Sequence, residues 1–491
     1  MNDSLARRTG SALVWRATQL LAGRAISLGR FLLLSLLLAP DVFGLLAIAA
    51  TALEVLLAFT AFGIEPALLQ RAKREERQYD VGWTIRLVRS AVVALAAAIA
   101  APVVAQIFGA PEATNLIRIL ALRPVIEALA SIKTVDLARD LNFRALALIT
   151  IPATVVEAVV SISLAQALEV WALVIGALLG AAAGSALSYL LAPYRPRIIF
   201  DRAPAAVLLR FGRWIWATSV IGVVGGAVLQ AVVSRRLGTV QLGLYFLAMR
   251  LAFLPNEAVT DVVRDVVFPL HAGLQSHLER SARVFRSSLV AMLAVIAPVY
   301  AALIAVAPSL SEDVLGSGWE GTARVIQILA VVGIIGALAD ATMPMLEGHG
   351  RPELVTVLYA IRSVIVVALV WPLAGSYGVE GAAAAWLAAE IGVQAGCAIF
   401  ANRVLPRPFR GLAIPIAVVA AAALCAGALA WGSNSVVGGP AGVFVGAVAG
   451  VLAGAIVLVW MDRRWEVGLA EDLGRVYPRL APLLRLPGPA D

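Results

Sequence analysis

Three arginines lie in the first long apolar segment, residues 15–38, which reads WRATQLLAGRAISLGRFLLLSLLL. Arginine stays ionised in proteins, and its planar guanidinium can bind a phosphate or a carboxylate through two parallel hydrogen bonds. A charge at the centre of a membrane helix costs about 2.5–3.5 kcal/mol on insertion scales, so such residues usually face the bundle interior or a wet cavity. The segment therefore offers anion-binding chemistry inside a membrane.

One face of this segment is polar, because Arg16, Gln19, Ser27 and Arg30 recur at a spacing that a helix places in one stripe. Arg24 lies about 80° to one side of the stripe. We expect the Arg16 side chain to reach the nearby membrane interface. Arg24 and Arg30 lie deeper, and we expect them to line a cavity; the alternative is an ion pair with acidic residues elsewhere.

Further charges interrupt later apolar segments. Arg250 has no acidic residue three or four positions away and is a candidate for the same cavity. Arg123 is most simply paired with Glu127, at i,i+4 on one helix face, and is also a possible secondary ligand, like Arg16, Gln19 and Ser27. Four acidic residues either carry coupling ions such as protons or are neutralised structural acids: Glu54, Glu157, Asp340 and Glu390. We expect Glu157, Asp340 and Glu390 to be lone buried acids.

The motifs of common enzymes are missing from the sequence. It has no GxSxG, HExxH or GxxxxGK[ST] pattern. Cys397 and Cys425 lie in apolar segments without redox or metal-ligand spacing, and the three histidines are expected to be solvated. We therefore expect neither an enzyme nor a metal or cofactor site.

Composition requires a membrane protein. Of the 491 residues, 61% are hydrophobic and 14% charged, against about 45–50% and about 25% in soluble chains. Because a span needs about 20 mostly apolar residues, the sequence predicts an all-α polytopic protein with about 14 transmembrane helices. They are expected at 15–38, 42–66, 83–107, 114–136, 145–166, 170–193, 212–234, 243–269, 287–308, 322–346, 353–374, 379–401, 412–432 and 440–461.

Basic residues concentrate in alternate loops. RAKREERQYD (71–80) and NRVLPRPFR (402–410) are examples, whereas the opposite loops hold only Arg235 and Arg236. The positive-inside rule then places both termini in the cytoplasm. The net charge of +8 is spread over these loops rather than gathered in one patch, so no nucleic-acid partner is expected. We interpret the first apolar segment as a retained helix rather than a signal peptide.

The chain contains an internal repeat. LAPDVFGLLAIAA (38–50) aligns with LGTVQLGLYFLAM (237–249), and IRILALRPVIEALA (117–130) aligns with IQILAVVGIIGALA (326–339). Both matches join corresponding predicted helices of two halves, an arrangement typical of transporters with the substrate site between the halves. We predict an N-lobe at 1–200, a C-lobe at 201–405, two further helices at 406–465 and a cytoplasmic tail at 466–491.

Glycines recur every four residues in the last predicted helix, at 442, 446, 450 and 454, and at 176, 180 and 184 in the sixth. Such spacing lets another helix approach closely. We expect packing within the chain rather than a dimer interface.

Three stretches resemble a known family in order and spacing: LAPDVFGLLAIA (38–49), GLYFLAMRLAFLP (243–255) and GWEGTARVIQILA (318–330). The chain resembles the polysaccharide-exporting and flippase branch of the multidrug/oligosaccharidyl-lipid/polysaccharide (MOP) superfamily over about residues 5–405. The resemblance implies two six-helix lobes in a V around a central cavity, working by alternating access. It also implies movement of an undecaprenyl-pyrophosphate-linked oligosaccharide from the inner to the outer leaflet of the bacterial cytoplasmic membrane.

The resemblance extends to single residues. Lipid II flippases of this superfamily keep two arginines six residues apart in helix one and another in helix eight, which Arg24, Arg30 and Arg250 match. These three would face the pyrophosphate of a lipid-linked exopolysaccharide, O-antigen or capsule unit. The implied partners are this substrate, membrane lipids, a polysaccharide polymerase and glycosyltransferases. The alternatives are a cation-coupled multidrug exporter and a non-transporting scaffold for polysaccharide assembly.

Overall fold

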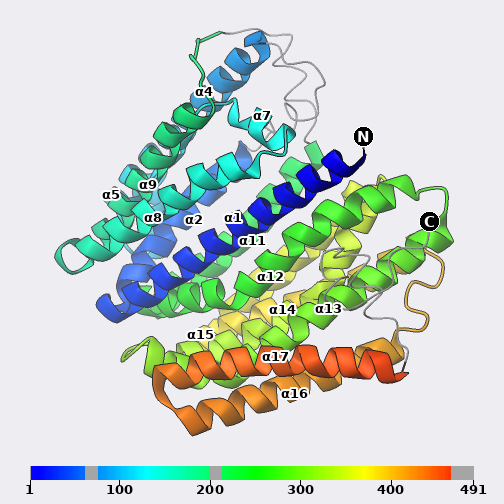
Figure 1. Cartoon of the computed structure of the whole chain (residues 1–491). Helices are drawn as coiled ribbons and strands as arrows, with labels where there is room; N and C mark the ends of the chain where they lie inside the picture. The colour runs from blue at the N-terminus through cyan, green and yellow to red at the C-terminus, as the bar shows by residue number, and fades with distance from the viewer. Residues whose placement is uncertain (1, 61–75, 200–212, 466–491) are drawn as a thin grey trace. The chain divides into compact units, whose positions relative to one another are not determined.

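The computed structural model describes residues 2–60, 76–199 and 213–465, and the regular elements within these ranges are all helical (Figure 1). The chain divides into two compact units, Met1–Gly243 and Leu244–Asp491, and each is described by itself. The division falls inside one long helix, α12 (Thr239–Gly273). The predicted tail at 466–491 lies outside the described residues.

The first unit is built around helix pairs, and α1 lies beside α8 and α8 beside α9 (Figure 1). Helix α11 packs against α2 and α4, which is why the unit extends beyond the lobe boundary that we predict near residue 200. Its helices are α1 (Asn2–Leu37), α2 (Pro40–Phe59), α4 (Glu76–Phe108), α5 (Ala113–Leu120), α6 (Arg123–Ala128), α7 (Thr134–Arg139), α8 (Phe143–Leu168), α9 (Val170–Leu191) and α11 (Arg213–Leu237).

The predicted span at 114–136 is wrong as a single helix. This segment forms three short helices, α5, α6 and α7, separated by turns. Pro124 stands at the start of α6. Its missing backbone N–H costs nothing in the first turn of a helix, but the same proline would interrupt a helix that ran continuously through this position. The break places Arg123 in the first turn of a new helix.

The second unit carries the last helices of the chain: α13 (Leu278–Ser309), a π-helical turn η1 (Leu310–Val314), α14 (Thr322–Gly348), α15 (Pro352–Val404), α16 (Ala413–Val437) and α17 (Gly439–Trp465). Helix α15 has 53 residues, equivalent to about 80 Å if it were straight. Gly378 breaks it with φ 61° and ψ −141°. The break separates the two spans predicted at 353–374 and 379–401.

The structure supports a number of spans close to the 14 that the sequence predicts. Eleven helices of the described ranges are long and apolar enough to cross a membrane, with α15 counted once. The second half of α15, the more charged α12 and the broken segment α5–α7 account for the remaining predicted spans. The chain is therefore an all-helical, multi-pass membrane protein.

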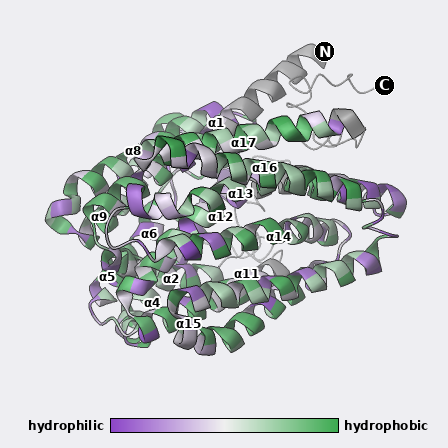
Figure 2. Cartoon of the chain, turned by 90° about the horizontal axis from the view of Figure 1, so that it is seen from below, coloured by the Kyte–Doolittle hydropathy of each residue, from purple (hydrophilic) through white to green (hydrophobic). Residues whose placement is uncertain are grey.

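The side chains of α4 form an exposed apolar face. Small residues such as Ala97 and Ala101 are buried, whereas Leu95 and Ile99 are 63% and 69% exposed. Large apolar side chains that face outward are unfavourable in water and favourable in hydrocarbon. Most helices are apolar along most of their length, as the green ribbon of Figure 2 shows.

The two copies of the internal repeat touch within the first unit. A Cβ added to Gly44 would lie 2.0 Å from the carbonyl oxygen of Thr239, and one added to Gly243 would lie 1.7 Å from that of Pro40. The contact is reciprocal, because each repeat-matched glycine meets the residue four positions before the other. Only glycine allows the two backbones to approach so closely, and this geometry supports the repeat.

The glycines of α17 pack within the chain, as expected. Gly446 and Gly450 lie against the carbonyl oxygens of Ala430 and Ala426 on α16 and against side chains of α13. A Cβ at either glycine would meet α16 backbone closer than 3.0 Å. The row therefore fixes α17 on α13 and α16.

Candidate functional site

The polar stripe of α1 faces α8 at two levels. Near its start, Arg16 donates a 3.5 Å hydrogen bond to Gln19, and its guanidinium lies 5.6 Å from the ring of Phe143. Arg24 and Ser27, further along, are half-buried. Arg30 reaches α8 itself.

Arg30 forms an ion pair with Glu157, in the middle of α8. The two side chains are 13% and 16% exposed, and the Arg30 guanidinium also lies 4.9 Å from the ring of Phe31. The expectation that Glu157 is a lone acid is wrong. Sequence spacing does not reveal its partner, because Arg30 lies 127 positions away.

Glu157 also approaches a second arginine. The Nη2 of Arg123 lies 3.9 Å from a carboxylate oxygen of Glu157. The Nε of the same arginine donates a 2.8 Å hydrogen bond to Glu127. The predicted i,i+4 pair is thereby confirmed. Two arginines and two carboxylates from α1, α6 and α8 form one chain of contacts whose formal charges cancel. Burying a guanidinium in a lipid-facing bundle requires such compensation.

Helix α9 holds Glu157 in place through its glycine row. A Cβ added to Gly180 would lie 2.7 Å from the Cβ of Glu157, and one added to Gly176 would lie 2.9 Å from its carbonyl oxygen. The row therefore lets α9 lie directly against the turn of α8 that carries the carboxylate. The glycine row of α9 therefore packs within the chain, as we expect from its spacing.

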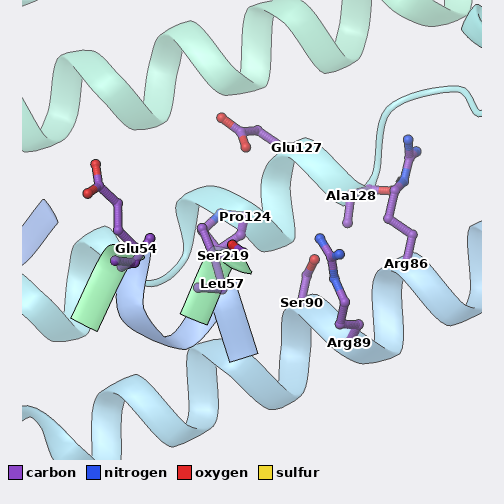
Figure 3. A pocket seen from close by; sticks show the side chains of 11 residues that line it. Glu54, Leu57, Arg86, Arg89, Ser90, Pro124, Glu127, Ala128 and Ser219 are labelled. Carbon is purple, nitrogen blue, oxygen red and sulfur yellow. Dashed lines mark hydrogen bonds between the residues drawn. The ribbon is translucent and has the colours of Figure 1, made fainter. Parts of the chain in front are cut away.

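A pocket of about 460 Å³ lies in the same unit, between α2, α4, α6 and α11 (Figure 3). It brings together Glu54, which the sequence singles out, and Glu127, which it pairs with Arg123. The pocket also contains Arg86 and Arg89, which our sequence analysis misses. The signal was present, since TIRLVRS puts two arginines three residues apart inside a predicted span.

In the second unit, Arg250 of α12 is exposed and its guanidinium lies 5.1 Å from the ring of Phe246. It belongs to a different unit from Arg24 and Arg30. A cavity lined by all three arginines therefore stays a prediction.

The acidic residues predicted as lone in this unit have partners. Glu390 is 2% exposed, pairs with Arg362 at 2.8 Å and accepts a hydrogen bond from Gln394. Asp340 accepts a 3.3 Å hydrogen bond from the amide of Asn256. The expectation of lone acids is therefore wrong for Glu390 and Asp340 too, because each needs a donor once it is removed from water. Their role in ion coupling remains a prediction.

The described ranges contain no group of three or more His, Cys, Asp or Glu side chains placed to hold a metal ion. The chemistry that they do offer is electrostatic: fixed guanidinium groups, compensated by carboxylates, inside an apolar helical bundle. That combination defines a multi-pass membrane protein with compensated charges inside its bundle.

The chain belongs to a family described as polysaccharide biosynthesis protein, whose sequence pattern matches residues 33–324, more than half of its length. It is 27% identical over 334 residues to the succinoglycan biosynthesis transport protein ExoT of Rhizobium meliloti (strain 1021), covering 68% of this chain and 67% of that protein. It is 25% identical over 358 residues to the lipopolysaccharide biosynthesis protein WzxC of Escherichia coli (strain K12), covering 72% of each. The resemblance stated from the sequence is confirmed.

Solved structures agree on the fold. The lipid II flippase MurJ in an inward closed conformation superposes with a TM-score of 0.72 at 14% identity, covering 92% of this chain and 99% of that one. An inward-facing multidrug resistance MATE transporter of the MOP superfamily gives 0.60 at 17% identity, covering 82% and 95%. The predicted MOP-like helical fold is thereby confirmed.

Proposed function

We propose that this protein is a flippase that moves an undecaprenyl-pyrophosphate-linked oligosaccharide from the inner to the outer leaflet of the bacterial cytoplasmic membrane. The oligosaccharide is the repeat unit of an exopolysaccharide, O-antigen or capsule. Related chains are named for the biosynthesis or transport of succinoglycan, lipopolysaccharide and teichuronic acid, all of them polysaccharides. We infer that both termini face the cytoplasm and that the protein performs no covalent chemistry itself.

The observation that carries the proposal is the row of arginines in α1, where Arg30 is held by Glu157. A pyrophosphate needs fixed positive charge to leave water, and guanidinium groups can hold it bidentately. Arg24, Arg30 and Arg250 supply that charge in this proposal, and the pyrophosphate replaces Glu157 as a ligand of Arg30. The ion pair then keeps Arg30 compensated between substrates.

Export from living cells tests the proposal. A strain lacking the gene is complemented with the wild type, with the Arg24→Ala/Arg30→Ala double variant or with Arg250→Ala, and surface polysaccharide is measured together with protein level. We expect both variants to lose export while the protein level is kept. Arg118→Ala is the matched control, because this exposed arginine of α5 bonds to Asn115 on its own helix and to the carbonyl oxygen of Ala98 on α4. Full display by the double variant would overturn the role of these arginines.

The multidrug exporter is the second candidate, favoured by the fold shared with MATE transporters. Drug susceptibility that changes with expression, while polysaccharide does not, would support it. A scaffold that assembles a polymerase and glycosyltransferases would instead tolerate loss of the arginines. Lysine substitutions at positions 24 and 30 separate charge from bidentate geometry, and we expect them to restore export only in part.

A further inference from the structure

Glu157 of α8 lies between two arginines that it does not hold equally. Arg30 of α1 pairs with one of its carboxylate oxygens, whereas the Nη2 of Arg123 of α6 lies 3.9 Å from the other oxygen. A charged hydrogen bond is about 2.7–2.9 Å long, so Arg123 is about 1 Å too far away to donate one. The carboxylate therefore has one bound arginine and a second arginine within reach of a small side-chain movement.

Arg30 keeps a donor that Glu157 does not use. Its Nη1 bonds to Glu157, whereas its Nε is buried and has no hydrogen-bond partner in the described part of the chain. A guanidinium carries five N–H donors in a planar fork, and a phosphate can bind two of them at once. A pyrophosphate on Arg30 would therefore satisfy a donor that the carboxylate leaves without a partner.

Helix α9 holds Glu157 and the start of α6 side by side. Gly180 of α9 lies against Glu157, since an added Cβ would be 2.7 Å from the Cβ of that residue. Ser185, further along α9, donates a 2.7 Å hydrogen bond to the carbonyl oxygen of Ile126 in α6. Arg123, three residues before Ile126, is therefore kept beside Glu157 by packing that does not involve α1.

Helix α1, which carries Arg30, has fewer packing constraints. Of its described side chains, Leu34 and Ser35 alone are buried. A Cβ added to Gly23 or Gly29 would meet no atom within 4 Å. Of the two arginines beside Glu157, the one on α1 is therefore the one that can leave, while the one on α6 stays.

We infer that Glu157 exchanges its partner Arg30 for Arg123 when the pyrophosphate of the substrate binds Arg30. The inference rests on the proposed function and assigns Arg123 a positioning role, in which it receives the displaced carboxylate instead of binding the substrate. The charges stay compensated after the exchange. Arg30 holds the pyrophosphate, Arg123 holds Glu157, and Glu127 keeps its bond to Arg123 and is 51% exposed, so water also stabilises it.

Two other roles of Arg123 predict different results. In a fixed network that only compensates Glu157, the affinity for pyrophosphate does not depend on Arg123. If Arg123 itself binds the pyrophosphate, its loss weakens binding whichever residue stands at position 157. Only the exchange makes the effect of Arg123 depend on the charge of Glu157.

Calorimetry with undecaprenyl pyrophosphate and the purified full-length protein in detergent tests the exchange. Arg123→Gln should weaken binding about tenfold, because the displaced carboxylate then has no second cation and competes for Arg30. Arg123→Gln/Glu157→Gln should bind at least as tightly as the wild type, and Arg118→Gln, the control, should bind like it. Wild-type affinity in Arg123→Gln, or weak binding that persists in the double variant, would overturn the inference.

A second variant keeps both arginines and Glu157, in case their removal prevents folding. Glu127 competes with Glu157 for Arg123. Glu127→Gln should therefore tighten the binding of undecaprenyl pyrophosphate about fivefold, and it should have a smaller effect in a Glu157→Gln background. Unchanged or weaker binding in Glu127→Gln alone, or an equal gain in both backgrounds, would contradict the exchange.

Failure of the exchange differs from failure of the proposed function. If Arg24→Ala/Arg30→Ala abolishes export and binding while the Arg123 and Glu127 variants bind like the wild type, the exchange fails and the proposed function stands. If the wild type shows no saturable binding and the gene deletion leaves surface polysaccharide unchanged, the proposed function fails, and the exchange fails with it.

Discussion

At the scale of single residues, the central feature is that the buried charges are shared rather than isolated. Arg30 and Arg123 both approach Glu157, and Arg362 holds Glu390 in the second unit. Removing one partner of a buried pair leaves an uncompensated charge, which costs more than the pair contributes. Such pairs can exchange partners only if the incoming ligand carries the same charge as the one it displaces.

The Arg30–Glu157 pair makes a prediction about stability. Glu157→Gln should lower the free energy of unfolding by about 3 kcal/mol, because it leaves a half-buried guanidinium without its carboxylate. Arg30→Gln/Glu157→Gln should recover part of that loss. Thermal unfolding in detergent measures the cycle, with Glu112→Gln, an exposed acid, as the control. Strict additivity of the two single changes would contradict direct coupling.

A histidine beyond the predicted span 243–269 makes a prediction about pH. The expectation that all three histidines are solvated is wrong for His271, which is fully buried at the end of α12. Its Nδ1 lies 2.7 Å from Ser281 Oγ, and Ser281 Oγ lies 3.3 Å from His349 Nε2. Burial, and then the neighbouring His349, lower the pKa of His271 to about 3. The unfolded chain, with a histidine pKa of about 6.5, binds more protons below that pH.

The stabilising contribution of the buried, neutral His271 is therefore complete above about pH 6.5 and is lost as the pH falls toward about 3. The melting temperature in detergent should drop by several degrees between about pH 7.5 and about pH 5, and His271→Gln should flatten this dependence. His277→Gln, an exposed histidine in the following loop, should leave it unchanged. A pH dependence identical in His271→Gln and the wild type would exclude this histidine as its source.

At the scale of elements, close helix packing positions the charges. Helix α9 meets α8 through a row of glycines, and the break of the 114–136 segment at Pro124 begins α6 at Arg123. Both features bring charges from separate helices to one level of the bundle. A change in the α8–α9 packing or in the start of α6 should therefore alter the contacts of Glu157.

Replacing Gly180 tests this dependence. Gly180→Val would force α9 away from α8, since even a Cβ lies 2.7 Å from that of Glu157. We expect a loss of about 1–3 kcal/mol and weaker coupling between Arg30 and Glu157 in the mutant cycle. Gly226→Ala is the matched control, because a Cβ there meets nothing within 4 Å. Unchanged coupling in Gly180→Val would show that α9 does not position the carboxylate.

At the scale of the whole molecule, the helices, their number and the basic loops define a topology. The segment between η1 and α14 and the loop between α14 and α15 lie at opposite ends of α14, so the membrane must separate them. The positive-inside rule assigns the second loop, GHGRPE, to the cytoplasm.

Cysteine labelling of intact cells tests this topology. In a Cys425→Ser background, Ser317→Cys should react with a membrane-impermeant maleimide, and Arg351→Cys should react only after the membrane is permeabilised. Both native side chains are exposed, so burial does not confound the comparison. The reverse pattern would invert the proposed orientation.

The sequence by itself determined the all-helical membrane fold, most of the spans and the Arg123–Glu127 pair, and three of its stretches carried the resemblance to the family. The fold, the spans and the pair follow from hydropathy and spacing, which act along the chain over one helix length. Only the tertiary structure decided that Glu157 and Glu390 have partners, that residues 114–136 break into three helices, and that Arg86, Arg89 and Glu54 share a pocket. Such contacts join residues far apart in the chain, and the pattern within one helix carries no information about which helix packs beside it.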